Sequence, residues 1–227
     1  MWIKICGLSR TEDVIQCATA GVSALGFLLA RSPVKSRNLD QLLLEEAALL
    51  VQRCKSIVES VVLTHATEID ELQNICRVAC PDTLQLQGDI APASLVSLST
   101  RFPNIRLIKK IGVHRLSTGD MLFKEIETFN TSGGIGFFVL DSARSDGGRG
   151  GTGNIHDWSL SASAVLAFPR CKFILAGGLT PDNIVDAIRI VRPHGADVMS
   201  GVSSARGIKD LDLVRSFVRR ARGAIPD

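Results

Sequence analysis

Residues 171–199 read CKFILAGGLTPDNIVDAIRIVRPHGADVM, and this stretch decides the fold. An apolar run at 171–176 ends in two glycines, and the segment 181–192 carries apolar residues at the spacing of a helix. Thr180 and Pro181 are expected to be the N-cap and the first residue of that helix. A second apolar run follows at 196–199. The stretch therefore predicts a strand, a helix and a second strand.

The same alternation extends over the whole chain. Strand-like apolar runs lie at 3–6, 24–29, 57–63, 83–86, 105–111, 135–140, 171–176 and 196–199. Helix-like segments lie at 11–20, 39–54, 68–80, 95–101, 120–129, 159–168, 181–192 and 209–221. Eight such pairs in 227 residues, with nearly continuous apolar strands, predict an α/β protein: a single (βα)8 TIM barrel over residues 1–227. An open doubly wound sheet is the alternative, but the glycine pattern of a dinucleotide fold does not follow the first run.

Composition excludes several classes of protein. A net charge of +3 is too small a bias to predict nucleic-acid binding. Neither a signal peptide nor an apolar stretch of membrane-spanning length is recognisable, so we expect a cytoplasmic protein that binds no membrane. The 6 cysteines lack the paired spacing of a zinc site, and we expect no metal.

Two reactive side chains follow predicted strands. Cys6 ends the first strand, and Asp141 comes directly after the sixth. Active sites of (βα)8 barrels lie at the carboxyl ends of the strands, so these groups are expected to flank one small substrate. A thiolate can take a proton from carbon, but its pKa of about 8.5 would have to be lowered by a nearby cation or a phosphate-site dipole. A carboxylic acid can protonate a ring oxygen if partial burial raises its pKa.

Small residues follow three successive strands. Gly177 and Gly178 come after the seventh strand, and Ser200 and Gly201 come after the eighth. The loops after strands seven and eight are the usual phosphate site of such barrels. Gly151, in a glycine-rich loop after the sixth strand, is a further source of backbone N–H groups for an anion. Together with the thiol and the carboxyl group, these turns indicate proton transfer on a sugar phosphate.

Other polar residues are expected to play no part in the chemistry. Lys109 and Lys110 are expected to begin a solvated loop after the fifth strand. Surface or loop positions without ligand roles are expected for the four histidines, His65, His114, His156 and His194.

The chain resembles the phosphoribosylanthranilate isomerase family of tryptophan biosynthesis. The matching segments are 4–8 (KICGL) with 12–13 (ED), 26–28 (GFL), 85–88 (QLQG), 140–141 (LD), 150–153 (GGTG), 157–159 (DWS), 176–183 (AGGLTPDN), 191–193 (VRP), 197–202 (DVMSGV) and 207–210 (GIKD). Their order and spacing agree from end to end.

This resemblance implies a (βα)8 enzyme that carries out an Amadori rearrangement on a small phosphoribosyl substrate. Asp141 would be the general acid that opens the furanose ring, and Cys6 the general base that removes the proton from C2'. The family uses no metal and no organic cofactor. The sequence leaves both a monomer and a homodimer open.

The chain departs from the family on the side that holds the anthranilate. The family's arginine for the anthranilate carboxylate corresponds to Arg37 if the loop has one inserted residue, or to Lys35 if it has none. Gln87 stands in place of the usual histidine, Asn154 in place of a lysine and Ser203 in place of a glutamate. Two alternatives therefore stay open: an isomerase for another phosphoribosylamine, or a catalytically weak barrel that binds a phosphate ligand.

Overall fold

The computed structural model describes residues 1–31, 40–114, 116–142 and 155–224. Within these ranges, eight parallel strands close into a barrel in chain order, and the last strand pairs with the first. The strands are β1 (Trp2–Ile5), β2 (Ala24–Leu28), β3 (Glu59–Thr64), β4 (Thr83–Leu86), β5 (Arg106–Val113), β6 (Phe137–Ser142), β7 (Lys172–Leu175) and β8 (Gly195–Val198). The predicted (βα)8 TIM barrel is confirmed.

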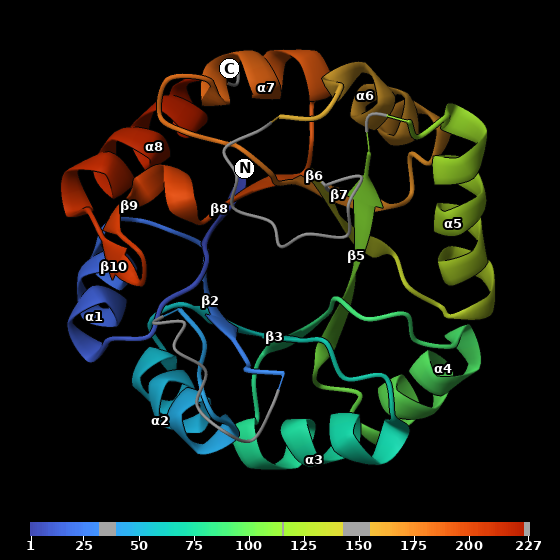
Figure 1. Cartoon of the computed structure of the whole chain (residues 1–227), viewed down its shortest axis with the longest axis horizontal. Helices are drawn as coiled ribbons and strands as arrows, with labels where there is room; N and C mark the ends of the chain where they lie inside the picture. Colours follow the sequence, from blue (N-terminus) through green and yellow to red (C-terminus); the bar gives the residue numbers. More distant parts are fainter. Residues whose placement is uncertain (32–39, 115, 143–154, 225–227) are drawn as a thin grey trace.

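Helices surround the barrel, as Figure 1 shows in a view along the barrel. They are α1 (Thr11–Thr19), α2 (Leu44–Cys54), α3 (Ile69–Ala79), α4 (Pro92–Arg101), α5 (Gly119–Ser132), α6 (Trp158–Ala167), α7 (Ile184–Val191) and α8 (Leu211–Gly223). A short turn, η1 (Ser200–Val202), and a hairpin of β9 (Ser203–Ala205) and β10 (Ile208–Lys209) precede α8. No helix in the described ranges has the length and apolar character needed to cross a membrane.

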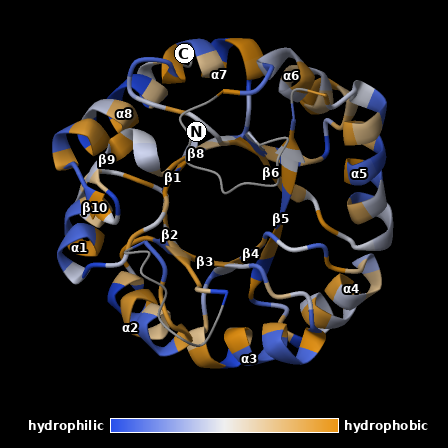
Figure 2. Ribbon diagram, in the orientation of Figure 1, coloured by the Kyte–Doolittle hydropathy of each residue, from blue (hydrophilic) through white to orange (hydrophobic). Residues whose placement is uncertain are grey.

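The alternation of side chains along each strand divides the core into two parts. On β1, Ile3 and Ile5 are fully buried in the large cluster between the strands and the helices. Cys6 belongs to a smaller cluster with Ala24 and Val61 inside the barrel. Figure 2 shows strands that are mainly hydrophobic and helices that carry both kinds of residue. Helices such as α3 and α8 therefore bury one apolar face on the barrel, as expected for an amphipathic helix.

Three predicted helix starts are wrong. The fourth helix begins at Pro92, three residues before the expected start. The seventh helix begins at Ile184, because residues 181–183 form a turn. Thr180 serves that turn instead of capping the helix: its hydroxyl accepts the Asp182 N–H at 3.2 Å, and its own N–H donates to Asn183 Oδ1 at 2.8 Å. The second helix begins at Leu44, because Leu42 forms an isolated parallel bridge with Leu29.

A carboxylate ties the strands together at the amino end of the barrel. Glu59 on β3 accepts hydrogen bonds from Trp2 Nε1 at 3.0 Å, Thr83 Oγ1 at 2.5 Å and Arg106 Nη1 at 2.6 Å. The Arg106 guanidinium also lies 5.0 Å from the centre of the Phe137 ring. These residues come from five different strands, so this end is held closed by side chains.

We expect Glu59→Ala to lower the free energy of unfolding by about 1–3 kcal/mol, since three donors lose their acceptor. The measurement is urea denaturation followed by circular dichroism. Glu45→Ala, at an exposed position in α2, is the matched control and should change the stability little. Equal stability of the two variants would contradict this role of Glu59.

Candidate active site

A cavity of about 510 Å³ lies at the carboxyl ends of the strands. Its volume is within the range of roughly 300–1,000 Å³ that is usual for small-molecule sites. It is lined by these predicted site residues: Cys6, Gln87, Asp141, Gly177, Gly178 and Ser200. The fold thus brings residues from distant parts of the chain to one cavity. Arg37, Lys35 and Gly151 lie outside the described residues.

Backbone hydrogen bonding and close packing fix Cys6 at the end of β1. The backbone N–H of Cys6 donates to Val198 O at 2.8 Å, across the seam between β1 and β8. Gly26 packs so closely that a Cβ there would lie 2.9 Å from Cys6 Sγ. Glycine at position 26 therefore leaves the space that the sulfur occupies.

Burial and nearby positive charges have opposite effects on the pKa of Cys6. Burial raises its pKa to about 11, although the positive charges of Lys4 and Lys209 act to lower it. The Asp197 carboxylate adds to the increase. The expected nearby cations are present, but the effect of burial on the pKa is larger than theirs. At neutral pH Cys6 is therefore a thiol.

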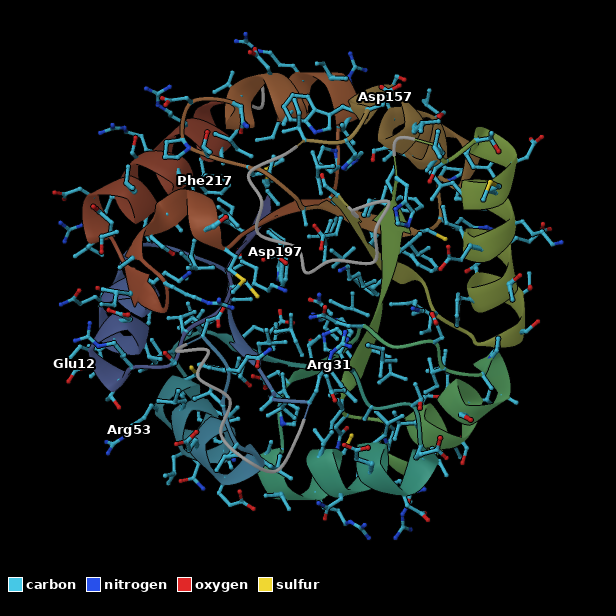
Figure 3. The ribbon with its side chains drawn as sticks, in the orientation of Figure 1. Glu12, Arg31, Arg53, Asp157, Asp197 and Phe217 are labelled. Carbon is cyan, nitrogen blue, oxygen red and sulfur yellow. The ribbon has the colours of Figure 1, made fainter. Side chains whose placement is uncertain are left out.

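Two charged residues inside the barrel were not predicted from the sequence as part of the site. Lys4 is fully buried, and its Nζ lies 2.8 Å from Asp197 Oδ2 and donates also to Gln85 Oε1. Burial alone would lower the pKa of Lys4, but Asp197, with further contributions from Cys6 and Asp141, raises it above the ordinary value. Figure 3 shows Asp197 well inside the ring of helices. A charged residue within each of two apolar runs is the signal that would have revealed this pair.

Asp141 has a cationic partner. Its Oδ2 lies 2.9 Å from Lys110 Nζ on the neighbouring strand β5. The expectation that Lys109 and Lys110 begin a solvated loop is wrong, since β5 continues to Val113 and contains both. Lys109 points the other way and is buried, with its Nζ donating to Gly88 O at 3.2 Å and to Lys110 O at 2.9 Å.

A buried histidine anchors the residue after Asp141. His156 precedes α6, and its backbone N–H donates to Ser142 Oγ at 3.0 Å, while its Nδ1 lies 2.9 Å from the same oxygen. Its Nε2 lies 2.6 Å from Ser161 Oγ. Burial lowers the pKa of His156 to about 4, so the ring is neutral. His156 therefore has a structural role that the sequence analysis missed.

The outer part of the cavity carries further polar side chains. Arg31 Nη2 lies 3.1 Å from His65 Nδ1, and both residues line the cavity together with His114. Because a guanidinium is always a donor, Nδ1 of His65 is the acceptor. Figure 3 shows Arg31 on the inner side of the helices, in contrast to Arg53. Two of the four histidines thus belong to the cavity, against expectation.

The two glycine turns lie directly against their neighbours. Gly177 and Gly178 have positive φ angles of 86° and 67°, which favour glycine. A Cβ at Gly177 would lie 2.4 Å from Ser142 N. A Cβ at Gly201 would lie 2.0 Å from Leu179 O, so Gly201 allows the turn after β8 to touch the turn after β7. Gly201 itself is absent from the residues that line the cavity.

Fold and cavity together define a (βα)8-barrel protein with a small-molecule site at the carboxyl ends of its strands. In the described part of the chain, no group of three or more His, Cys, Asp or Glu side chains is placed to hold a metal ion. The family model for N-(5'-phosphoribosyl)anthranilate (PRA) isomerase matches residues 3–220. The chain belongs to this family.

Curated relatives match over nearly the full length. The N-(5'-phosphoribosyl)anthranilate isomerase 2 of Methanosarcina mazei is 33% identical over 98% of this chain and 94% of its own. The N-(5'-phosphoribosyl)anthranilate isomerase of Chromohalobacter salexigens is 38% identical over 95% of this chain and 92% of its own.

Solved structures show the same arrangement. The phosphoribosyl anthranilate isomerase of Thermus thermophilus superposes with a TM-score of 0.80 at 26% identity, covering 99% of this chain and 100% of that chain. A phosphoribosyl anthranilate isomerase in complex with reduced 1-(o-carboxyphenylamino)-1-deoxyribulose 5-phosphate superposes with a TM-score of 0.77 at 25% identity, covering 98% and 99%.

We expect the rate at which iodoacetamide alkylates Cys6 to rise about tenfold per pH unit from pH 7 to pH 9.5 without a plateau, because the thiolate reacts and the pKa is about 11. Mass spectrometry of the peptide that contains Cys6 gives the rate. The exposed Cys80 in the same sample is the internal control for the reagent. A plateau near pH 8 would contradict the assignment of a raised pKa.

Proposed function

We propose that this chain converts N-(5'-phosphoribosyl)anthranilate into 1-(o-carboxyphenylamino)-1-deoxyribulose 5-phosphate, a step of tryptophan biosynthesis. One observation carries the proposal: in a chain of this family, the Cys6 thiol and the Asp141 carboxyl group line one cavity with the glycine turns after β7 and β8. The reaction moves hydrogen from C2' to C1', so a proton donor and a proton acceptor are the groups that it needs.

The first step of the proposed mechanism opens the furanose ring. Asp141 gives a proton to the ring oxygen, the bond from that oxygen to C1' breaks, and the nitrogen lone pair forms a C1'=N iminium bond. Lys110 already donates to Oδ2 of Asp141, so we assign the transferred proton to Oδ1. The ring oxygen stays on C4' as a hydroxyl group.

The second step removes the proton from C2'. The iminium group draws electrons from C2', and the C2'–H bond breaks as Cys6 takes the proton, which gives an enolamine. Before this transfer, Cys6 loses its own proton to solvent. The positive charges of the iminium group, Lys4 and Lys209 favour the resulting thiolate. The Cys6 thiol then gives the proton from C2' to C1', and the C2' hydroxyl gives its proton to the Asp141 carboxylate, which forms the ketone and restores the acid.

The two ends of the substrate are assigned to different parts of the protein. We assign the phosphate to the turns with Gly177, Gly178 and Ser200, with Gly151 as a further backbone donor and Gly201 holding the turns together. We assign the anthranilate carboxylate to Arg37, with Lys35 as the alternative, because a planar guanidinium suits a carboxylate. Gln87 lines the cavity and is assigned to substrate binding.

The proposal extends to the remaining properties of the protein. The enzyme is an intramolecular oxidoreductase in the aldose–ketose class and uses no metal and no organic cofactor. Residues 1–227 act as one domain, in the cytoplasm, as a monomer or a homodimer. Its partner is the small phosphoribosyl substrate, and nucleic acid and membranes are not partners.

We expect the purified protein to convert freshly made N-(5'-phosphoribosyl)anthranilate, and Cys6→Ser to lower kcat by roughly 10²–10⁴-fold, since a hydroxyl is a much weaker acid than a thiol. The loss of substrate fluorescence measures turnover. Cys80→Ser is the matched control and should keep wild-type turnover. Faster conversion of N-(5'-phosphoribosyl)aniline would favour another phosphoribosylamine as substrate, and binding without conversion would favour a binding barrel.

We expect Asp141→Asn to lower kcat by roughly 10²–10⁴-fold, because an amide keeps the size of the side chain but cannot deliver the proton. The pH profile of kcat in this variant should lack the alkaline limb that a general acid produces. Asp120→Asn, at an exposed position in α5, is the control. An unchanged profile in Asp141→Asn would remove Asp141 from the acid role.

A further inference from the structure

Lys209 is a buried cation whose charge favours the Cys6 thiolate in the proposed mechanism, but that mechanism gives no role to its hydrogen bonds. Lys209 lies at the end of β10, with only 8% of its surface exposed. Its Nζ donates to Met199 O at 2.9 Å and to Ser203 Oγ at 3.1 Å. These two acceptors are the residues directly before and directly after the turn η1 (Ser200–Val202).

The two acceptors are also bonded to each other. The Ser203 hydroxyl donates to Met199 O at 2.9 Å, so this carbonyl oxygen accepts from both the ammonium and the hydroxyl group. The three groups form a closed ring of hydrogen bonds across the base of the turn. Such a ring fixes the distance between the two ends of η1 and therefore the direction in which Ser200 faces the cavity.

The other end of Lys209 is anchored to the first helix. Its backbone N–H donates to Asp13 Oδ2 at 3.2 Å, and Asp13 is itself buried in α1. The Met199 side chain packs on Gly7, where a Cβ would lie 2.6 Å from Met199 Cε. Lys209 thus ties the turn after β8 to α1, while Met199 ties it to the loop that follows Cys6.

Burying the ammonium group of Lys209 costs free energy, because the charge loses its contact with water. Burial lowers the pKa of Lys209, although the charges of Cys6, Cys17, Asp197 and Asp13 act in the opposite direction. A methionine has a similar length and no charge to desolvate. Besides its charge near Cys6, the ammonium adds the pair of hydrogen bonds to Met199 and Ser203, and these set the geometry of the turn.

We propose that Lys209 is a positioning residue for the phosphate group: it holds the turn Ser200–Val202 in the shape that binds a phosphate against the glycine turn after β7. This inference rests on the proposed function, which assigns the substrate phosphate to these turns. It gives a role to Asp13 and Lys209, which lie in two of the segments that match the family.

Inorganic phosphate is the probe, and isothermal titration calorimetry with the full chain measures its dissociation constant. We expect Lys209→Met to raise that constant about tenfold, the loss typical of a hydrogen bond to a charged group. Ser203→Ala, which removes one acceptor and leaves Met199 O, should raise it about two- to threefold. Lys124→Met, at an exposed position in α5, is the control and should bind phosphate as the wild type does.

Steady-state kinetics separates positioning from a general loss of structure. In Ser203→Ala, KM for N-(5'-phosphoribosyl)anthranilate should rise about two- to threefold, while kcat stays within about threefold of the wild type, since Cys6, Asp141 and the charge of Lys209 are untouched. In Lys209→Met, KM should rise about tenfold and kcat should fall as well, because the Cys6 thiolate loses a favourable charge. Phosphate binding and KM within twofold of the wild type in a folded Lys209→Met would overturn the proposal. If Lys209→Met does not fold, wild-type phosphate binding by Ser203→Ala would overturn it.

The titration does not depend on turnover, so the two proposals fail separately. A wild type that binds phosphate but leaves N-(5'-phosphoribosyl)anthranilate unchanged would overturn the proposed function, and the effect of Lys209→Met on phosphate binding would still decide the role of Lys209. A wild type that does not bind phosphate would overturn the role of Lys209.

Discussion

The ion pair between Lys4 and Asp197 spans the seam at which the barrel closes. The two residues are direct partners in the register of β1 and β8, and their side chains meet inside the barrel at 2.8 Å. A slip of one residue would turn either side chain outward and leave a buried charge alone, and breaking such a pair costs about 3–5 kcal/mol. The pair therefore fixes the register of the seam. Cys6, two residues after Lys4, then faces the same interior and points into the cavity.

The same cluster of charges sets the chemistry of the thiol. Burial favours the neutral form of Cys6, while the positive charges of Lys4 and Lys209 favour the thiolate. In the proposed mechanism, the iminium cation adds a further positive charge only after the ring has opened. The proposal thereby couples base strength to the progress of the reaction, with ring opening by Asp141 before proton removal by Cys6. Burial and charge act together, and neither alone accounts for a reactive cysteine here.

The sequence predicted the barrel and several of the residues that line the cavity, because both depend on local patterns. Apolar runs gave the strands, and residues directly after them, such as Cys6 and Asp141, line the cavity in the structure. Contacts between distant segments could not be predicted from local patterns. Lys4 meets Asp197 only because β8 pairs with β1. Lys110 meets Asp141 only because β5 pairs with β6. His156 was missed for the same reason, since its partners come from β6 and α6. The start of α7 was misplaced because Thr180 and Pro181 suit a turn as well as a helix.

The central claim is that one substrate lies between Cys6 and Asp141 with its phosphate on the turns after β7 and β8. A crystal structure of Cys6→Ser with reduced 1-(o-carboxyphenylamino)-1-deoxyribulose 5-phosphate tests this claim most directly. The account predicts the phosphate at Gly178 and Ser200, and the C2' atom about 3–3.5 Å from Oγ of the new serine, as expected for reacting atoms. Asp141 should lie on the other side of the sugar chain. A phosphate bound elsewhere, or a C2' atom out of reach of residue 6, would contradict the account.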